Sequence, residues 1–147
     1  MKLTIAWIGK TKSPAIQALT DEYLKRLRQY CEADGVPLKD EAALLKLCGR
    51  DGRGARRRLA LLDSRGKQLS SEELAKFLGD HQDKNPLPLV FAVGAADGFS
   101  ESARRQADVI LSFGKMTLAH ELARVVLLEQ LYRGFTILKG HPYHLGH

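Results

Sequence analysis

The chain ends in HPYHLGH, a segment that contains three of its five histidines, His141, His144 and His147. Three imidazoles at this spacing raise the question of a metal site. A structural zinc site, however, takes four ligands, and neighbouring groups must hold those ligands in place. A segment that includes Pro142 and Gly146 offers little of that rigidity. We therefore expect no bound metal.

Within the same segment, Tyr143 and His144 are candidates for a different chemistry. Each side chain combines a flat ring with a polar edge, which suits holding a nucleobase and exchanging a proton with it. Spacing alone leaves open whether the pair does this or forms an exposed chain end.

Three motifs elsewhere in the chain are incomplete. Residues 9–11 (GKT) resemble half of a phosphate-binding loop, but the glycine required five positions earlier is Thr4. Residues 94–98 (GAADG) lack the GxGxxG spacing of a dinucleotide site. His120 begins HELAR, and a zinc peptidase needs a second histidine where Arg124 stands. These function classes are excluded. Gly94 either allows a ligand to approach the backbone closely or permits a tight turn from strand to helix.

The chain is basic, with a net charge of +6 and a pI of about 9.5 over 147 residues. Residues 49–58 (GRDGRGARRR) hold five of the arginines. This balance favours polyanionic partners, nucleic acid first, although a solvated basic loop is equally compatible with the run. We expect no membrane span and no signal peptide, and the isolated Cys31 and Cys48 favour a reduced, cytoplasmic setting.

Apolar periodicity and capping residues define the elements that must position these groups. We expect strands over residues 2–8, 59–63, 87–93 and 108–113, and a short edge strand around 36–38. We expect helices over residues 14–31, 41–48, 101–107 and about 118–132. A further helix should start at the capping box formed by Ser70 and Glu73. Residues 64–67 (SRGK) indicate a turn, 135–138 (FTIL) an extended piece, and His81 a partly exposed helix end.

Alternating strands and helices predict a single α/β domain, residues 1–147, with a mainly parallel sheet and flanking helices. In such sheets a ligand binds beyond the carboxyl ends of the strands. The loops after Leu62, Val93 and Phe113 are therefore the predicted binding site.

Residues 111–144, LSFGKMTLAHELARVVLLEQLYRGFTILKGHPYH, resemble the C-terminal signature of the ribosomal RNA large-subunit methyltransferase H (RlmH) family of the SPOUT superfamily. MKLTIAWIGKTK, LLDSRGKQLSSEELA and VFAVGAADGFS resemble further stretches of that family, in the same order. The match covers about residues 1–30 and 59–144.

This resemblance implies an α/β fold with a C-terminal trefoil knot, and a cytoplasmic homodimer whose active site lies near the dimer interface. It implies binding of S-adenosylmethionine in the knot, and methylation of N3 of a pseudouridine in 23S rRNA of the assembled ribosome. No metal is expected.

The resemblance also assigns site residues. The cofactor pocket would be formed by Leu62, Gly94, Phe113, Gly114, Lys115, Met116, Thr117 and Leu118. The catalytic residues would be Tyr143, His144 and Arg133: Tyr143 and His144 would orient the target base, with His144 the better proton acceptor. Arg133 would contact rRNA phosphate or the cofactor carboxylate, or alternatively pair with Glu129 one helical turn away.

The chain departs from the family pattern at several points. Ala95 replaces a glycine, Gly114 replaces a serine, the segment 31–58 is short, and residues 145–147 extend the tail. The altered loop positions Ala95 and Gly114 support an alternative, a ribosome- or RNA-binding protein of the same fold that has lost catalysis.

Overall fold

The computed structural model describes residues 1–145, over which strands and helices alternate. The strands are β1 (Lys2–Ile8), β2 (Glu32–Leu38), β3 (Arg58–Gln68), β4 (Leu89–Val93) and β5 (Val109–Ser112). The helices are α1 (Pro14–Leu27), α2 (Glu41–Leu47), α3 (Ser71–Lys84), α4 (Glu101–Gln106) and α5 (His120–Leu138).

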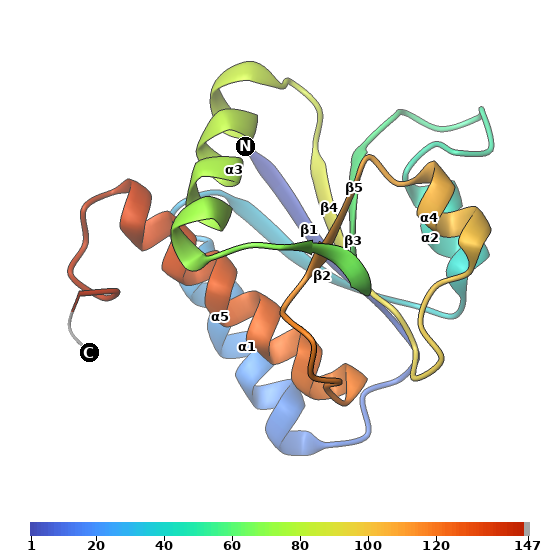
Figure 1. Cartoon of the computed structure of the whole chain (residues 1–147), viewed down its shortest axis with the longest axis horizontal. Coiled ribbons are helices and arrows are strands. Elements are labelled where there is room, and N and C mark those ends of the chain that lie inside the picture. Colours follow the sequence, from blue (N-terminus) through green and yellow to red (C-terminus); the bar gives the residue numbers. More distant parts are fainter. Residues whose placement is uncertain (146–147) are drawn as a thin grey trace.

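These strands form one parallel sheet in the order β2-β1-β4-β3-β5. Helices α1, α3 and α5 cover one face, and the shorter α2 and α4 cover the other (Figure 1). The predicted fold class, a parallel α/β sheet with flanking helices, is confirmed. No helix within residues 1–145 is both long and apolar enough to cross a membrane.

Each sheet face has its own apolar core. The larger core lies between the sheet and α1, α3 and α5, and includes Phe91, Leu128 and Phe135. The smaller core lies beneath α2 and α4, and includes Leu44 and Phe99. Burial on both faces explains the uninterrupted apolar sequence of β4, whose five residues are all buried.

Local hydrogen bonds set the helix starts that the sequence predicts. Ser13 caps α1 by accepting from the amide of Ile16, with Pro14 in the first position. Ser70 and Glu73 form the reciprocal capping box of α3, at 3.1 and 2.9 Å.

Two predicted local structures are wrong. Residues 135–138 are not extended but complete α5, because Gly134, Phe135 and Thr136 are buried against the sheet and neighbouring helices. His81 is not partly exposed: its side chain is buried, at 2% exposure, where its ring hydrogen-bonds Arg58 and the carbonyl of Leu87.

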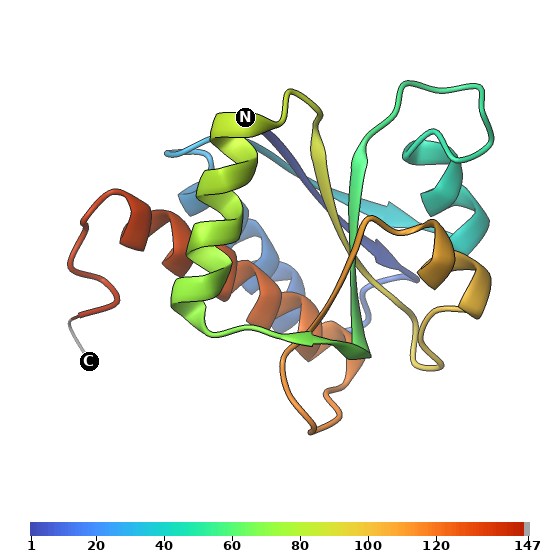
Figure 2. The same ribbon diagram turned by 45° about the horizontal axis from the view of Figure 1, so that its top comes forward.

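Residues 64–67 also differ from the predicted turn, since they belong to the long strand β3. Leu62 pairs with Leu111, and after an irregularity Lys67 pairs with the same residue. The end of β3 therefore crosses β5, as both views show (Figures 1 and 2). At the crossing, Gly66 lies so close to the backbone that a Cβ atom would stand 2.6 Å from Leu111.

Candidate functional site

A pocket of about 280 Å³ opens at the carboxyl ends of β4 and β5, beside the point at Leu62 where β3 stops pairing with β4. Its walls are the part of β3 that continues past Leu62 and the loops that follow Val93 and Phe113, so two of the three predicted loops are loops and the third is strand. Seven of the eight residues predicted for the cofactor line it: Leu62, Gly94, Phe113, Gly114, Met116, Thr117 and Leu118. Lys115 is exposed and lies outside the lining.

The loops achieve this shape through particular backbone conformations. Gly114 has a φ of +128°, in the left-handed region that favours glycine, and the Ser112 hydroxyl accepts from its amide at 3.1 Å. Gly94 is buried directly before the turn that Ala95 and Gly98 close, and a Cβ atom on Gly94 would stand 3.2 Å from the ring of Phe99. Ala95 has no positive φ, so alanine fits this loop without strain. Both sequence departures are therefore compatible with the pocket.

Sequence reasoning missed the charged groups in the pocket. The Asp63 carboxylate, 9% exposed, lies 3.7 Å from the Arg104 guanidinium and accepts a hydrogen bond from the amide of Arg65 at 2.9 Å. Arg104 also donates to the carbonyl of Phe99 at 2.6 Å. His120, at the start of α5, completes the wall. Asp63 immediately follows Leu62. The rule that ligands bind beyond the carboxyl ends of parallel strands would therefore have included it if applied one residue further.

A second cavity of about 290 Å³ adjoins the first. The two share the wall made by Leu62, Leu111, Ser112 and Phe113. On the far side of that wall, Ser71 donates to Gln130 at 2.6 Å, which joins α3 to α5. Together the cavities reach the volume that proteins devote to small-molecule ligands.

The C-terminal tail forms a separate polar cluster against α5. The ring of Tyr143 packs edge-on against Tyr132, and its hydroxyl donates to Glu129 at 3.1 Å. Arg133 donates to the same carboxylate at 2.6 and 3.1 Å, so the predicted Arg133–Glu129 ion pair is present. Burial, reinforced by Glu129, raises the pKa of Tyr143 to about 12. The tyrosine hydroxyl is therefore a hydrogen-bond donor at physiological pH.

His144 bridges the tail and α3. Its Nδ1 lies 3.0 Å from Arg133, and its Nε2 lies 2.8 Å from the Glu72 carboxylate. An arginine can only donate, so Nδ1 of the neutral ring accepts, and Nε2 carries the hydrogen that bonds Glu72. Both ring nitrogens are thus engaged, and the tautomer is fixed by the partners.

The residues predicted to bind the cofactor and those predicted to act on the base do not lie together within one chain. Arg133, Tyr143 and His144 lie together, but neither Arg133 nor any residue from 139 to 145 lines the pocket. The first tail histidine, His141, accepts a hydrogen bond from the amide of Tyr143 at 3.2 Å. Gly146 and His147 lie outside the described residues. Within residues 1–145, no group of three or more His, Cys, Asp or Glu side chains is arranged to hold a metal ion.

Comparisons with known proteins give the family. A family model described as "Predicted SPOUT methyltransferase" matches residues 1–144. Ribosomal RNA large subunit methyltransferase H of Koribacter versatilis is 60% identical over 147 residues, the whole of both chains. The chain belongs to the RlmH family of SPOUT methyltransferases. The RlmH protein of Geotalea daltonii is 42% identical over 152 aligned positions, which cover 98% of this chain and 99% of that one.

Solved structures share the fold of this RlmH-family chain at low sequence identity. A probable methylase family protein from Haemophilus influenzae Rd KW20 has a TM-score of 0.60 at 11% identity, covering 96% of this chain and 69% of that one. The SpoU methyltransferase AviRb from Streptomyces viridochromogenes, solved with the cofactor AdoMet, has a TM-score of 0.51 at 13% identity. This chain spans 57% of the AviRb chain, which covers 90% of this one.

Proposed function

We propose that this protein transfers a methyl group from S-adenosylmethionine to N3 of a pseudouridine in 23S rRNA of the assembled ribosome. The observation that carries the proposal is its end-to-end match, at 60% identity, to ribosomal RNA large subunit methyltransferase H of Koribacter versatilis. The chain would act as one domain, in the cytoplasm where ribosomes are found. The crossing of β3 over β5 is where we place the family's knot.

The pocket at the strand ends suits this cofactor. Apolar side chains such as Leu62, Met116 and Leu118 can enclose a flat adenine, while backbone groups of the surrounding loops bond its edges. The Asp63 carboxylate can accept hydrogen bonds from ribose hydroxyls or from the ammonium group. When bound, the cofactor supplies a methyl group on a sulfonium, and its in-line transfer depends mainly on positioning.

The tail residues suit the target base. Tyr143, held protonated, can donate to a base carbonyl once its hydroxyl leaves the Glu129 carboxylate. His144 can take the N3 proton on Nδ1 once Arg133 leaves that nitrogen for an rRNA phosphate or the cofactor carboxylate. Glu72 would then keep Nε2 protonated. N3 would lose its proton to His144 and gain the methyl group, which bound S-adenosylmethionine would supply from its sulfonium, leaving a neutral thioether.

We further propose a homodimer in which the tail of one protomer serves the pocket of its partner. Within one chain the tail lies apart from the pocket, so a complete site requires a second copy. Apolar side chains are exposed on α1, on the loop before α5 and on the first turn of α5: Leu19, Met116, Leu118 and Leu122. Met116 and Leu118 also line the pocket, so an interface over them would bring a partner to its mouth.

Calorimetric titration of S-adenosylmethionine at low salt is the first test, with S-adenosylhomocysteine and NAD as controls. We expect saturable binding of the two sulfur compounds and none of NAD. Failure of both to bind, together with no methylation of ribosomes, would favour the catalytically inactive RNA-binding alternative.

The tail assignment is tested by His144→Ala in a methylation assay on ribosomes. We expect kcat to fall by about a hundredfold or more, the usual contribution of a positioned proton acceptor. Lys139→Ala, an exposed change just before the tail residues, is the matched control and should retain activity. Normal turnover of His144→Ala would show that another group removes the proton.

A further inference from the structure

The arginine-rich segment forms a loop whose conformation is held by specific hydrogen bonds and ion pairs. Residues 49–57, which we call the arginine loop, join α2 to β3 (Figure 2). The loop lies at the amino ends of the strands, the edge of the sheet opposite the pocket. Gly49 turns the chain with a φ of +76°, and a Cβ atom there would stand 2.8 Å from the carbonyl of Ala55.

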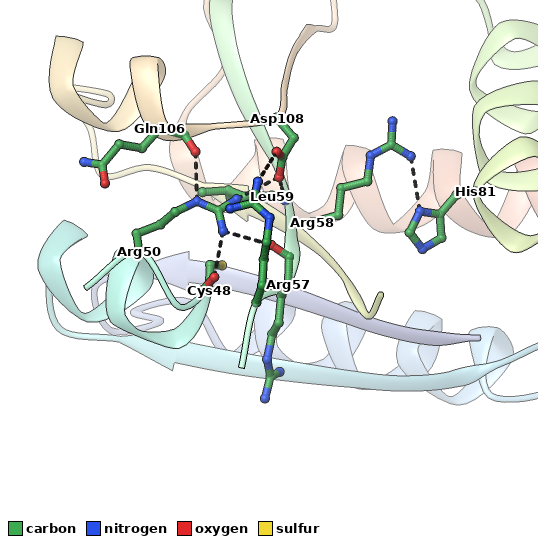
Figure 3. Close-up of polar contacts among 9 residues, drawn as sticks. Cys48, Arg50, Arg57, Arg58, Leu59, His81, Gln106 and Asp108 are labelled. Carbon is green, nitrogen blue, oxygen red and sulfur yellow. Dashed lines mark hydrogen bonds and ion pairs between the residues drawn. The ribbon is translucent and has the colours of Figure 1, made fainter. Parts of the chain in front are cut away.

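One arginine of this loop acts as its internal support. The Arg50 side chain is only 6% exposed, and it donates to the carbonyls of Cys48, Arg57 and Gln106 at 2.7, 3.1 and 2.9 Å (Figure 3). It also pairs with Asp108 at 2.7 Å. Arg50 thereby fastens both ends of the loop to the α4–β5 turn.

Asp108 completes this support. Its carboxylate accepts from Arg50, from Arg56 at 2.7 Å and from the amide of Leu59 at 2.8 Å. The one acidic residue inside the loop, Asp51, accepts from the backbone amide of Arg53 at 3.1 Å. Both nearby carboxylates are therefore already engaged.

Of the remaining arginines in the loop, Arg53 and Arg56 are exposed and Arg57 is partly exposed. Arg56 is 57% exposed despite its ion pair. Within the described residues, Arg53 and Arg57 have no acidic side-chain partner. The Arg57 side chain points away from the Arg50 cluster, and no contact is drawn to its guanidinium (Figure 3). The fixed backbone thus presents three guanidinium groups from a five-residue stretch.

We propose that the arginine loop is a second docking surface for rRNA, one that binds backbone phosphates at a distance from the target base. The inference rests on the proposed function, because the RNA is the one that carries that base. Guanidinium groups match phosphate geometry, and a loop held by a buried arginine loses little conformational freedom on binding. A basic loop that only increased solubility would need no such support.

The loop's position defines what it would contact. It is separated from the pocket by the paired stretch of β3, Arg58–Leu62, or about 17 Å at the usual rise per residue. Phosphates this far from the reacting nucleotide would set the orientation of the protein on the ribosome, without taking part in the chemistry.

The test compares Arg53→Ala/Arg57→Ala with Lys25→Ala/Lys84→Ala, which removes the same charge from α1 and α3, helices on the other sheet face. Affinity for large ribosomal subunits is measured by filter binding over a range of salt concentrations, alongside methylation kinetics. We expect the arginine variant to bind on the order of tenfold more weakly and to lose about two units of the salt-dependence slope. Its KM for ribosomes should rise while kcat and S-adenosylmethionine binding stay unchanged.

Two further samples make the outcome specific. Arg53→Lys/Arg57→Lys keeps the charge and should retain most of the affinity, which separates charge from loop structure. Isolated 23S rRNA should show the same loss as subunits. Equal losses in the lysine control, unchanged binding of the arginine variant, or a loss seen on subunits but absent on naked rRNA would overturn the proposal. Absence of methyl transfer by the unaltered protein would instead count against the proposed function.

Discussion

Among single residues, buried His81 couples stability to pH. Its Nε2 donates to the carbonyl of Leu87, and its Nδ1 accepts from Arg58, which also stacks on Phe77 at 4.6 Å. The neutral ring satisfies both contacts. Burial lowers the pKa of His81 from its usual value near 6.5, and the nearby Arg58 charge lowers it further.

We predict that the unaltered protein loses stability as the pH falls below about 6.5. There the unfolded chain takes up a proton that the folded chain refuses, so the free energy of unfolding falls by up to about 1.4 kcal/mol per pH unit until the folded pKa is reached. Denaturant unfolding at pH 7.5 and pH 5 measures this. His81→Gln keeps a donor and an acceptor but cannot titrate, so its stability should change less over this interval. Equal pH dependence in both proteins would contradict the prediction.

A second residue-scale prediction concerns Tyr143. Since burial and Glu129 raise its pKa to about 12, tyrosinate absorbance from Tyr143 should appear only near that pH. Glu129→Gln removes the nearby negative charge and should lower the pKa. Ultraviolet titration measures both, with Tyr143→Phe subtracted to remove the other tyrosines. An identical titration of Tyr143 in the Glu129→Gln variant would mean that burial alone sets the pKa.

Among elements, the crossing of β3 over β5 is the place with least room. We predict that Gly66→Ala destabilises the protein by several kcal/mol, because its Cβ would overlap backbone atoms of Ile110 and Leu111 that cannot move aside. Thermal unfolding and S-adenosylmethionine titration should both show the loss, since β5 ends in the pocket wall. Gly54→Ala is the control, because a Cβ there makes an ordinary contact at 3.6 Å. Equal stability of the two variants would contradict this view of the crossing.

The elements also show how far sequence reasoning reaches. Buried parallel strands and capped helices were predictable because each has a local signature, such as the apolar run of β4 or the capping box at Ser70. The same sheet topology predicted the three places where the pocket is lined, after Leu62, Val93 and Phe113, although the first of them is strand and not loop. The prediction for residues 135–138 was wrong because the apolar, partly β-branched run FTIL suits a strand as well as the end of a helix that buries Phe135 and Thr136. The crossing at Gly66 and the fold-back of Tyr143 depend on distant contacts, which no local pattern encodes.

For the whole molecule, the separation of tail and pocket makes the proposed dimer testable by complementation. Thr117→Trp should fill the pocket without disturbing the core, because Thr117 is an exposed lining residue. It should abolish S-adenosylmethionine binding and leave the tail intact. His144→Ala should leave the pocket intact and remove the proton acceptor of the tail.

We predict that a refolded equal mixture of these two variants recovers about a quarter of the unaltered activity, since half the dimers are mixed and each holds one complete site. Each variant alone should remain inactive, and light scattering should give twice the chain mass of 16.3 kDa. No recovery in a mixture of proven dimers would mean that each chain completes its own site.

The strand order has a further consequence, for the chain while it is being made. The neighbours of β1 are β2, which follows within a few dozen residues, and β4, which begins only at Leu89. About eighty residues lie between the end of β1 and that partner, and translation at 5–20 residues per second takes roughly 4 to 16 s to add them. Throughout this interval the backbone N–H and C=O groups along one edge of β1 are unpaired and open to pairing with other nascent chains. A protein that modifies ribosomes thus depends, during its own synthesis, on whatever shields that edge at the ribosome exit.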